Sequence, residues 1–497
     1  MSPVTATTQP TRARLGIWHH PAALLPVLLS LVIGVLGIRR DDTVWHDEAA
    51  TLGLAGRSLP ELWQTLGNID AVHGLYYLLM HGLFSSFGTD VLVLRLPSVL
   101  ATAVAVHGVA LLGTRLASRR VGLIAALVFA VLPDVQRYAQ EGRSYALVCA
   151  LVVWASYLLV LAVDRPGRTQ LWMGYGALML GACLLHEFAV LAVAAHAVAI
   201  PRTAWRPWGW AAGGVVTGLT PLAVLSVRQS AQVAWVDEVS TGEYWSFGAM
   251  AAVGLACGIL VRQSADSERC GGVTLTRLAV PLLIAPTGLL MGLSLFKPLY
   301  VERYVLYGVA GLALLLGAGA DRVLRMGRLP VAGVVAASVA ACVALVPASV
   351  NLRTPESRSD NVTDLANAIA REGDVGDSVI YLSIKRRAGT LVYPLGGSGL
   401  GDLALAQGPD ESRGLYGTEI PAREIRERIL ENRRVLAVRE PAGGLADRSD
   451  PALLEANRVK EATLDAYFTS CRTVTVNGAQ VTLYARDTYD CGKFRTT

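Results

Sequence analysis

The segment PAALLPVLLSLVIGVLGIRRDDTVWHDE, residues 21–48, decides the fold class. It opens with an apolar run, residues 21–38, that predicts a first membrane-spanning helix. No small-residue cleavage site follows the run, so we interpret it as a retained helix and not as a removed signal peptide. Arg39, Arg40 and then the tetrad Trp45-His46-Asp47-Glu48 come next. Adjacent carboxylates at a membrane exit indicate a functional site, and an ordinary acidic interfacial loop is the alternative.

The composition of the 497-residue chain is that of an integral membrane protein, with 53% hydrophobic and 17% charged residues and a mean hydropathy of +0.44. The net charge is +5, but no basic block interleaved with aromatics occurs, which argues against nucleic acid as a partner. The apolar runs predict a polytopic α-helical protein with about 11 spans. These spans are expected near residues 21–38, 93–114, 121–134, 144–163, 171–185, 188–201, 208–227, 247–261, 279–296, 303–320 and 329–349.

Arginine residues accumulate in every second loop between these runs, which predicts a cytoplasmic N-terminus by the positive-inside rule. The segment GLYYLLMHGLFSSF, residues 74–87, is apolar, but about 14 residues are too few to cross a bilayer core of about 30 Å. We interpret it as a helix lying in the outer interface, within a first outer loop of residues 39–91. Residues 80 and 480 are then expected outside and residue 118 in the cytoplasm of a plasma-membrane protein.

Residues 1–350 form the predicted membrane domain, and the composition turns polar from there on. Residues 351–497 are expected to fold as a soluble extracytoplasmic α/β domain. Cys471 and Cys491 are either joined by a disulfide, if this region faces an oxidising compartment, or two free thiols. The patterns predict helices over residues 363–371 and 422–431, strands over 378–383 and 435–438, and a hairpin of 473–476 and 481–484 around Asn477-Gly478.

Five polar segments share the predicted outer face, with carboxylates early in the chain and arginines at later helix ends. One arginine at such a place can simply extend to the headgroups, whereas several on one face suggest a clamp for a phosphate. A carboxylate beside such a clamp could deprotonate an acceptor hydroxyl or hold a divalent metal against the phosphate. This layout is typical of group transfer from a lipid phosphate. The segments are Trp45–Glu48, Asp70–Tyr77, Arg95–Ser98, Gln136–Leu147 and Lys297–Tyr304.

These segments resemble the GT-C superfamily of membrane glycosyltransferases, in particular the family 39 group. That group includes protein O-mannosyltransferases and resembles the aminoarabinose transferase of lipid A. The chain departs from the group's pattern at His73-Gly74-Leu75, where His-Pro-Pro is frequent. The matching elements, in order, are Asp47-Glu48, Asp70…His73…Tyr76-Tyr77, Arg95-Leu96-Pro97, the string QEGRSYAL at residues 140–147, and Pro298…Arg303-Tyr304.

The resemblance implies a polyprenyl-phosphate-linked sugar donor, chemistry on the extracytoplasmic side and inversion at the anomeric carbon. It implies that Asp47 is the catalytic base and that Glu48 supports it. Donor-phosphate contacts are expected from Arg95, Arg143 and Arg303. The residues of the same motifs that are expected to bind substrate are Asp70, His73, Tyr76, Glu141 and Tyr304.

His186-Glu187, at an outer helix junction, could ligate a divalent metal together with His46, Asp70 or His73, or it could be an ordinary interfacial pair. The leading hypothesis is an inverting transferase that moves mannose or a pentose to a cell-envelope glycan, lipid or protein. A lipid or sugar transporter is the alternative, although transporters place charges at mid-membrane and show internal repeats. A non-catalytic membrane scaffold is the third. The C-terminal domain is expected to tune the acceptor and not to perform the chemistry.

Overall fold

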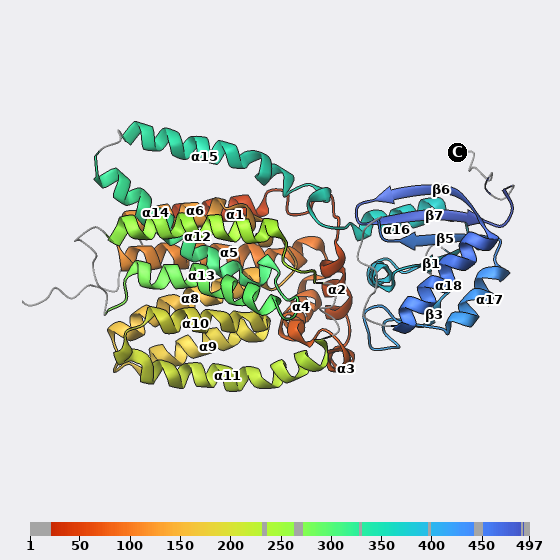
Figure 1. Ribbon diagram of the computed structural model, residues 1–497, viewed down its shortest axis with the longest axis horizontal. Coiled ribbons are helices and arrows are strands. Elements are labelled where there is room, and N and C mark those ends of the chain that lie inside the picture. The colour runs from red at the N-terminus through yellow and green to blue at the C-terminus, as the bar shows by residue number, and fades with distance from the viewer. Residues whose placement is uncertain are drawn as a thin grey trace, which may run out of the picture.

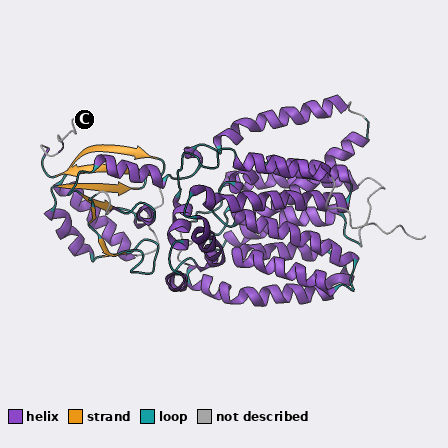
Figure 2. Ribbon diagram, turned by 180° about the vertical axis from the view of Figure 1, so that it is seen from behind, coloured by secondary structure: helices purple, strands orange, loops and turns teal. Residues whose placement is uncertain are grey.

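The computed structural model describes residues 21–230, 236–262, 272–327, 331–395, 399–441, 451–488 and 491. It shows a long helical bundle with an α/β domain at one end (Figure 1). The described strands all lie in that C-terminal domain, as Figure 2 shows. The predicted fold class, a polytopic helical membrane protein with a C-terminal α/β domain, is confirmed.

Each predicted span corresponds to a helix. Six described helices are long and apolar enough to cross a membrane, or seven if α6 and α7 (Pro133–Ala139), bent by 64°, count as one. Pro133 begins α7, which accounts for the break because proline cannot continue the hydrogen bonding of α6. The bundle helices are α1 (Pro21–Val35), α5 (Val91–Leu116), α6 (Arg119–Val131), α8 (Tyr145–Asp164), α9 (Thr169–Leu185), α10 (Leu191–Ala199), α11 (Trp205–Arg228), α12 (Thr241–Arg262), α13 (Leu275–Ser294), α14 (Val309–Arg325) and α15 (Val331–Asn351).

Small residues let the central helices approach closely, as is usual inside membranes, where lipid tails give no hydrophobic advantage to packing. A Cβ atom on Gly113 of α5 would lie 2.7 Å from the Cα of Gly122 of α6. A Cβ on Gly317 of α14 would lie 2.8 Å from the Cβ of Ala125 of α6. The helices α5, α6 and α14 therefore pack tightly at the centre of the bundle.

Short helices cover that end of the bundle: α2 (His46–Ala55), α3 (Leu59–Asn68), the 3-10 turn η2 (Ala71–His73) and α4 (Gly74–Phe87) (Figure 1). The helix α4 has the bounds that the sequence predicts and stops at Gly88, whose φ of +86° suits glycine. Tyr76, Tyr77, Met80 and Phe84 are buried, whereas Leu78 and Leu79 are about two-fifths exposed. A helix at the end of the bundle with exposed leucines on one face fits the interpretation as an interfacial helix. The orientation of the protein across the membrane stays a prediction.

The C-terminal domain is built on a mixed five-stranded sheet of order β2-β1-β5-β7-β6. The strand β1 is parallel to β2 and β5, and β5, β7 and β6 are antiparallel. The strands are β1 (Ser378–Tyr381), β2 (Gly401–Asp402), β5 (Arg434–Arg439), β6 (Thr469–Val476) and β7 (Ala479–Ala485), with a separate pair β3 (Leu405–Gln407) and β4 (Thr418–Glu419). The helices are α16 (Val362–Glu372), η8 (Ile384–Leu391), α17 (Ala422–Glu431) and α18 (Pro451–Tyr467).

The predicted hairpin is present, and Gly478 turns it with a φ of +81°. The helices α16 and α17 and the strands β1 and β5 lie at the predicted residues, whereas α18 and η8 were not predicted. A disulfide joins Cys471 of β6 to Cys491, with their Cα atoms 5.4 Å apart. It ties the chain that follows β7 back to the edge strand of the sheet.

Candidate active site

Glu48 is locked inside the protein by arginine. Its carboxylate is fully buried and receives Nε and Nη2 of Arg95 at 2.8 and 2.7 Å. The backbone N–H of Gly142 donates at 2.9 Å, and Nη2 of Arg40 lies at 3.4 Å. Burial by itself would raise the pKa of Glu48, but Arg95 and Arg40 outweigh it and hold the pKa at about 2. Glu48 is therefore a permanent anion that fixes α2 on the bundle.

Arg95 does not have the predicted role of a donor-phosphate contact. Its side chain is fully buried, and all five N–H groups have partners inside the protein. Beyond the two bonds to Glu48, it donates to the backbone carbonyls of Ile38, Arg39 and Thr43 at 2.7, 3.0 and 2.6 Å. A phosphate would have to displace several of these bonds, so we correct the assignment: Arg95 anchors the turn before α2.

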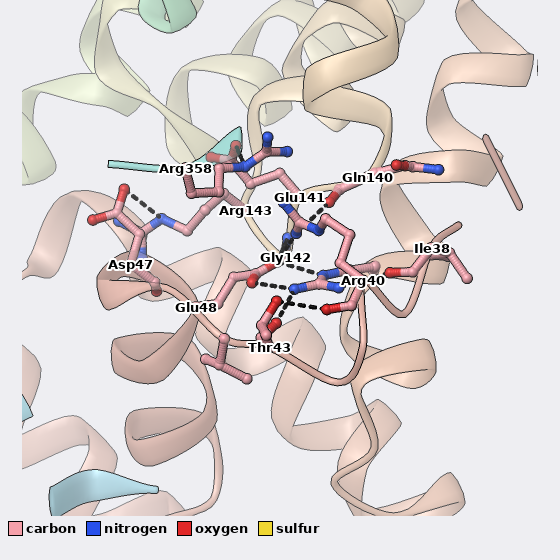
Figure 3. Close-up of polar contacts among 12 residues, drawn as sticks. Ile38, Arg40, Thr43, Asp47, Glu48, Gln140, Glu141, Gly142, Arg143 and Arg358 are labelled. Carbon is pink, nitrogen blue, oxygen red and sulfur yellow. Dashed lines mark hydrogen bonds and ion pairs between the residues drawn. The ribbon is translucent and has the colours of Figure 1, made fainter. Parts of the chain in front are cut away.

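Asp47 diverges from its neighbour, because successive helical residues point about 100° apart. Figure 3 shows Asp47 directed toward Arg143 while Glu48 faces Arg40. Its Oδ2 lies 3.5 Å from Nη2 of Arg303 and 3.9 Å from Nε of Arg143, and it accepts no hydrogen bond in the described part of the chain. Burial acts to raise the pKa of Asp47, yet the two arginines and nearby histidines lower it overall. The site thus holds an ionised carboxylate whose Oδ2 atom is buried and has no hydrogen-bond partner among the described residues.

Tyrosines orient the two arginines around Asp47. Nη1 of Arg143 donates to the hydroxyl of Tyr77 at 3.1 Å, and Nε of Arg303 donates to the hydroxyl of Tyr145 at 3.1 Å. The guanidinium of Arg303, in the 3-10 helix η6 (Glu302–Gly308), also lies 5.8 Å from the ring centre of Trp45. Nε of Arg143 is buried and has no hydrogen-bond partner among the described residues. Two of the three arginines predicted to bind phosphate, Arg143 and Arg303, therefore converge on Asp47.

A second carboxylate, that of Asp70, is linked to the site by Tyr77, whose hydroxyl donates to Oδ2 of Asp70. Asp70 adopts a left-handed backbone with φ of +61°, which places it at the turn before η2. Burial raises its pKa, and Arg143 and Tyr77 only partly offset this effect. The chain of contacts Asp70–Tyr77–Arg143 makes Tyr77, rather than the predicted Tyr76, the tyrosine that reaches the arginine. The hydroxyl of Tyr76 is buried with no hydrogen-bond partner within the described residues.

Aromatic and histidine rings line the side of the site away from α2. The rings of His186 and Tyr304 are 4.4 Å apart, and those of His73 and His186 are 5.7 Å apart. Glu187 turns elsewhere and accepts a hydrogen bond from Ser226 at 2.9 Å. The described residues contain no group of three His, Cys, Asp or Glu side chains arranged to hold a metal ion. His186 and Glu187, the predicted metal pair, therefore have different surroundings: His186 packs against Tyr304, and Glu187 bonds Ser226.

Glu141 contacts the chain that enters the C-terminal domain. Its Oε2 lies 3.5 Å from Nε of Arg358, and both side chains are buried. Arg358 also donates to the carbonyl of Arg137 at 3.0 Å. Burial raises the pKa of Glu141, and Arg358 opposes that rise. Oε2 of Glu141 therefore holds the chain that enters the C-terminal domain, whereas Oε1 has no hydrogen-bond partner among the described residues, and the substrate-binding role stays a prediction.

Comparison with known proteins shows a similar sequence over part of the chain and a similar fold over nearly all of it. Residues 74–227 match a sequence family described as dolichyl-phosphate-mannose-protein mannosyltransferase. A comparison with curated proteins gave no match. ArnT from Cupriavidus metallidurans in the apo state is similar in structure, with a TM-score of 0.59 at 11% identity over 95% of this chain and 99% of that chain.

Two further solved structures show the same fold with lipid phosphates bound. ArnT from Cupriavidus metallidurans bound to undecaprenyl phosphate matches with a TM-score of 0.53 at 11% identity, over 93% of this chain and 97% of that one. The archaeal oligosaccharyltransferase AglB from Archaeoglobus fulgidus, in complex with an inhibitory peptide and a dolichol-phosphate, matches with a TM-score of 0.52 at 10% identity, over 95% and 75% of the two chains.

The fold is thus that of the multi-pass GT-C membrane proteins. More closely, the chain resembles the protein mannosyltransferase family over residues 74–227 and ArnT in its fold, so the resemblance inferred from the sequence is confirmed.

Proposed function

We propose that this protein is an inverting glycosyltransferase that moves a sugar from a polyprenyl phosphate to an acceptor on the extracytoplasmic side. The related ArnT structure with undecaprenyl phosphate and the AglB structure with dolichol-phosphate support a lipid-phosphate donor. Mannose, suggested by the description of the matching family, and a pentose are the two candidate sugars. The observation that carries the proposal is the position of Oδ2 of Asp47, which lies between Arg143 and Arg303 and has no hydrogen-bond partner among the described residues.

The chemistry follows from these groups. The acceptor hydroxyl donates its proton to Oδ2 of Asp47 while its oxygen attacks the anomeric carbon of the donor sugar. The bond between that carbon and the phosphate oxygen breaks, and its electron pair leaves with the polyprenyl phosphate. Attack from the side opposite the leaving group inverts the configuration. An ionised Asp47, maintained by Arg143 and Arg303, is ready to accept the proton at neutral pH.

The same two arginines can stabilise the departing phosphate. Their ion pairs with Asp47 are 3.5 and 3.9 Å long, so they are looser than well-formed hydrogen bonds. Nε of Arg143 has no hydrogen-bond partner within the described residues, and a guanidinium readily binds a phosphate oxygen. Preorganised cations stabilise the charge that develops in the transition state, which is usually a large contribution to catalysis.

The test uses purified protein in lipid nanodiscs with polyprenyl-phosphate mannose or polyprenyl-phosphate pentose, following release of the polyprenyl phosphate. We expect D47N to reduce turnover by about 10²–10⁴-fold with little change in donor affinity. D90N is the matched control, because Asp90 is an exposed carboxylate that caps α5 by accepting from the N–H of Leu92 at 2.7 Å. Full turnover in D47N would remove the base from the mechanism, and lost donor binding with preserved turnover would indicate a structural role.

A further inference from the structure

The catalytic helix α2 lacks a cap of its own. Its N-cap residue is Trp45, whose side chain makes no capping hydrogen bond and contains no oxygen to accept one. The first N–H groups of a helix have no partner within the helix, and Ser, Thr, Asp or Asn usually supplies one. In α2 this unsatisfied turn contains His46, Asp47 and Glu48. The helix start that carries the base therefore depends on an acceptor from elsewhere.

That acceptor comes from the C-terminal domain. Oδ1 of Asp360 accepts the backbone N–H of His46 at 2.8 Å, across 314 positions of sequence. The chain on both sides is joined as well: Val362 N donates to Val44 O at 2.9 Å, and Val44 N donates to Oγ1 of Thr363 at 3.0 Å. Three hydrogen bonds thus hold the residues just before Asp47 against the first turn of α16.

Asp360 is itself fixed within its own domain. Its Oδ2 pairs with Nη1 of Arg386 at 3.1 Å, and Arg386 in turn forms a two-pronged ion pair with Glu440, at 2.8 and 2.5 Å. Asp360 and Arg386 are both nearly buried, so water cannot easily replace either partner. Glu440 directly follows β5, a central strand of the sheet. The position of the acceptor is therefore set by the folded C-terminal sheet.

A second contact acts on the same helix turn. The hydroxyl of Tyr416 lies 3.3 Å from Nε2 of His46, and the two rings are stacked with centres 6.0 Å apart. Arg387, from the same domain, donates to the carbonyl of Tyr416 at 3.1 Å. His46 is thus held through its backbone by Asp360 and through its ring by Tyr416.

We infer that Asp360 is a positioning residue for Asp47: the C-terminal domain caps the catalytic helix in place of a local capping residue and so sets the direction of the base. This inference rests on the proposed function. It revises the expectation that the domain only tunes the acceptor, because Asp360 bonds the residue next to the base. Arg143 and Arg303 each have a shorter hydrogen bond outside α2, to Tyr77 and Tyr145 at 3.1 Å, so we expect the cap to act on turnover more than on donor affinity.

The test compares three single variants of the full chain. D360A removes the cap, whereas D360N keeps an oxygen that can accept the N–H of His46 and loses only the charge. D377A is the matched control: Asp377 pairs with Arg434 at 3.1 Å in the same domain, away from α2. We expect D360A to lower kcat by about 10–100-fold with the donor KM unchanged, since small misplacements of a reacting group cost about that much. D360N should keep turnover within a few-fold of wild type, and D377A should match wild type.

Hydrogen exchange gives a reading that does not depend on activity. The amides of residues 46–49 should exchange faster in D360A than in wild type, D360N or D377A. If D360A does not fold, the triple variant D360A/R386M/E440M, which also removes Arg386 and its second partner Glu440 so that neither charge is left without the other, is measured in the same way. Equal kcat in D360A and D377A, or unchanged exchange at residues 46–49, overturns the inference. A wild-type protein that turns over neither donor refutes the proposed function, while the exchange data still decide whether Asp360 caps α2.

Discussion

Replacing Glu48 by Gln should damage the fold, whereas replacing its neighbour Asp47 by Asn should damage only turnover. Glu48 is fully buried, and its pKa is lowered from 4.5 to about 2, which corresponds to about 3 kcal/mol of favourable interaction with its surroundings. Breaking a buried ion pair by removing one partner typically costs about 3–5 kcal/mol, because the other charge stays buried alone. Both routes give a similar loss for E48Q, since Arg95 has no other carboxylate partner in the described structure.

D47N offers the contrast within the same helix turn. The ion pairs of Asp47 with Arg303 and Arg143 are 3.5 and 3.9 Å long, and Oδ2 forms no hydrogen bond with described residues. Its loss should therefore cost less stability than the loss of Glu48, because the ion pairs of Asp47 are longer and no hydrogen bond to Oδ2 is removed. The assay is the thermal inactivation rate and apparent melting temperature of the purified variants in one fixed detergent and lipid mixture. D90N again serves as the Asp-to-Asn control.

The pH dependence gives the sign of the Glu48 effect. A carboxylate with a depressed pKa in the folded protein contributes stability above its unfolded pKa, and that contribution is lost as the pH falls through the folded pKa. Wild type should therefore lose about 3 kcal/mol between about pH 4.5 and pH 2, and E48Q should lack this part of the acid dependence. An E48Q protein as stable as D47N, with the same acid profile as wild type, would refute the burial argument.

Three further outcomes are expected. R143A should raise the donor KM in the nanodisc assay, because a phosphate contact is lost in the ground state too, and an unchanged donor KM would remove Arg143 from donor binding. Burial acts to raise the pKa of Asp47, but Arg143 and Arg303 lower it by more, so turnover should stay flat down to about pH 5 and its decline should be centred below the usual aspartate pKa of about 3.9. A decline centred near pH 7 would point to another group. The topology is tested with single cysteines in a C342S background, which removes an exposed native cysteine. At exposed positions, S86C and T475C should react with an impermeant thiol reagent added outside, and G167C should not. Labelling of G167C from outside would reverse the predicted topology.

Much of the architecture could be predicted because membrane constraints are strong. Each span predicted from an apolar run has a helix in the structure, since a chain in lipid must satisfy its backbone hydrogen bonds internally. The helix at residues 74–87 has the predicted bounds, and its position in the outer interface stays a prediction. In the soluble domain, α18 was not predicted because its charged and small residues leave little apolar periodicity, with only Ala456, Lys460, Thr463 and Leu464 buried.

The site was predicted less completely, because a motif identifies residues and not the directions of their side chains. Arg95 was grouped with Arg143 and Arg303 as a phosphate contact, but only the burial of Glu48 shows that Arg95 is its partner. Tyr77, and not the predicted substrate-binding residue Tyr76, bonds Arg143, because one position on a helix is a rotation of about 100°; the role of Tyr76 stays a prediction. Local pattern alone could not have located Asp360, since nothing near residues 44–46 points to a partner 314 residues away.

The two carboxylates of the tetrad divide one problem between them. A base that must be ionised, exposed to substrate and fixed in direction cannot itself be tightly hydrogen-bonded, because each such bond would occupy the oxygen that takes the proton. In this protein the short hydrogen bonds are made by the residues on either side of Asp47: Glu48 accepts from Arg95, and the backbone N–H of His46 donates to Asp360. Asp47 lies between these two residues, and its Oδ2 has no hydrogen-bond partner among the described residues. Rigid support of this kind is what keeps a reactive side chain within the narrow geometry that catalysis requires.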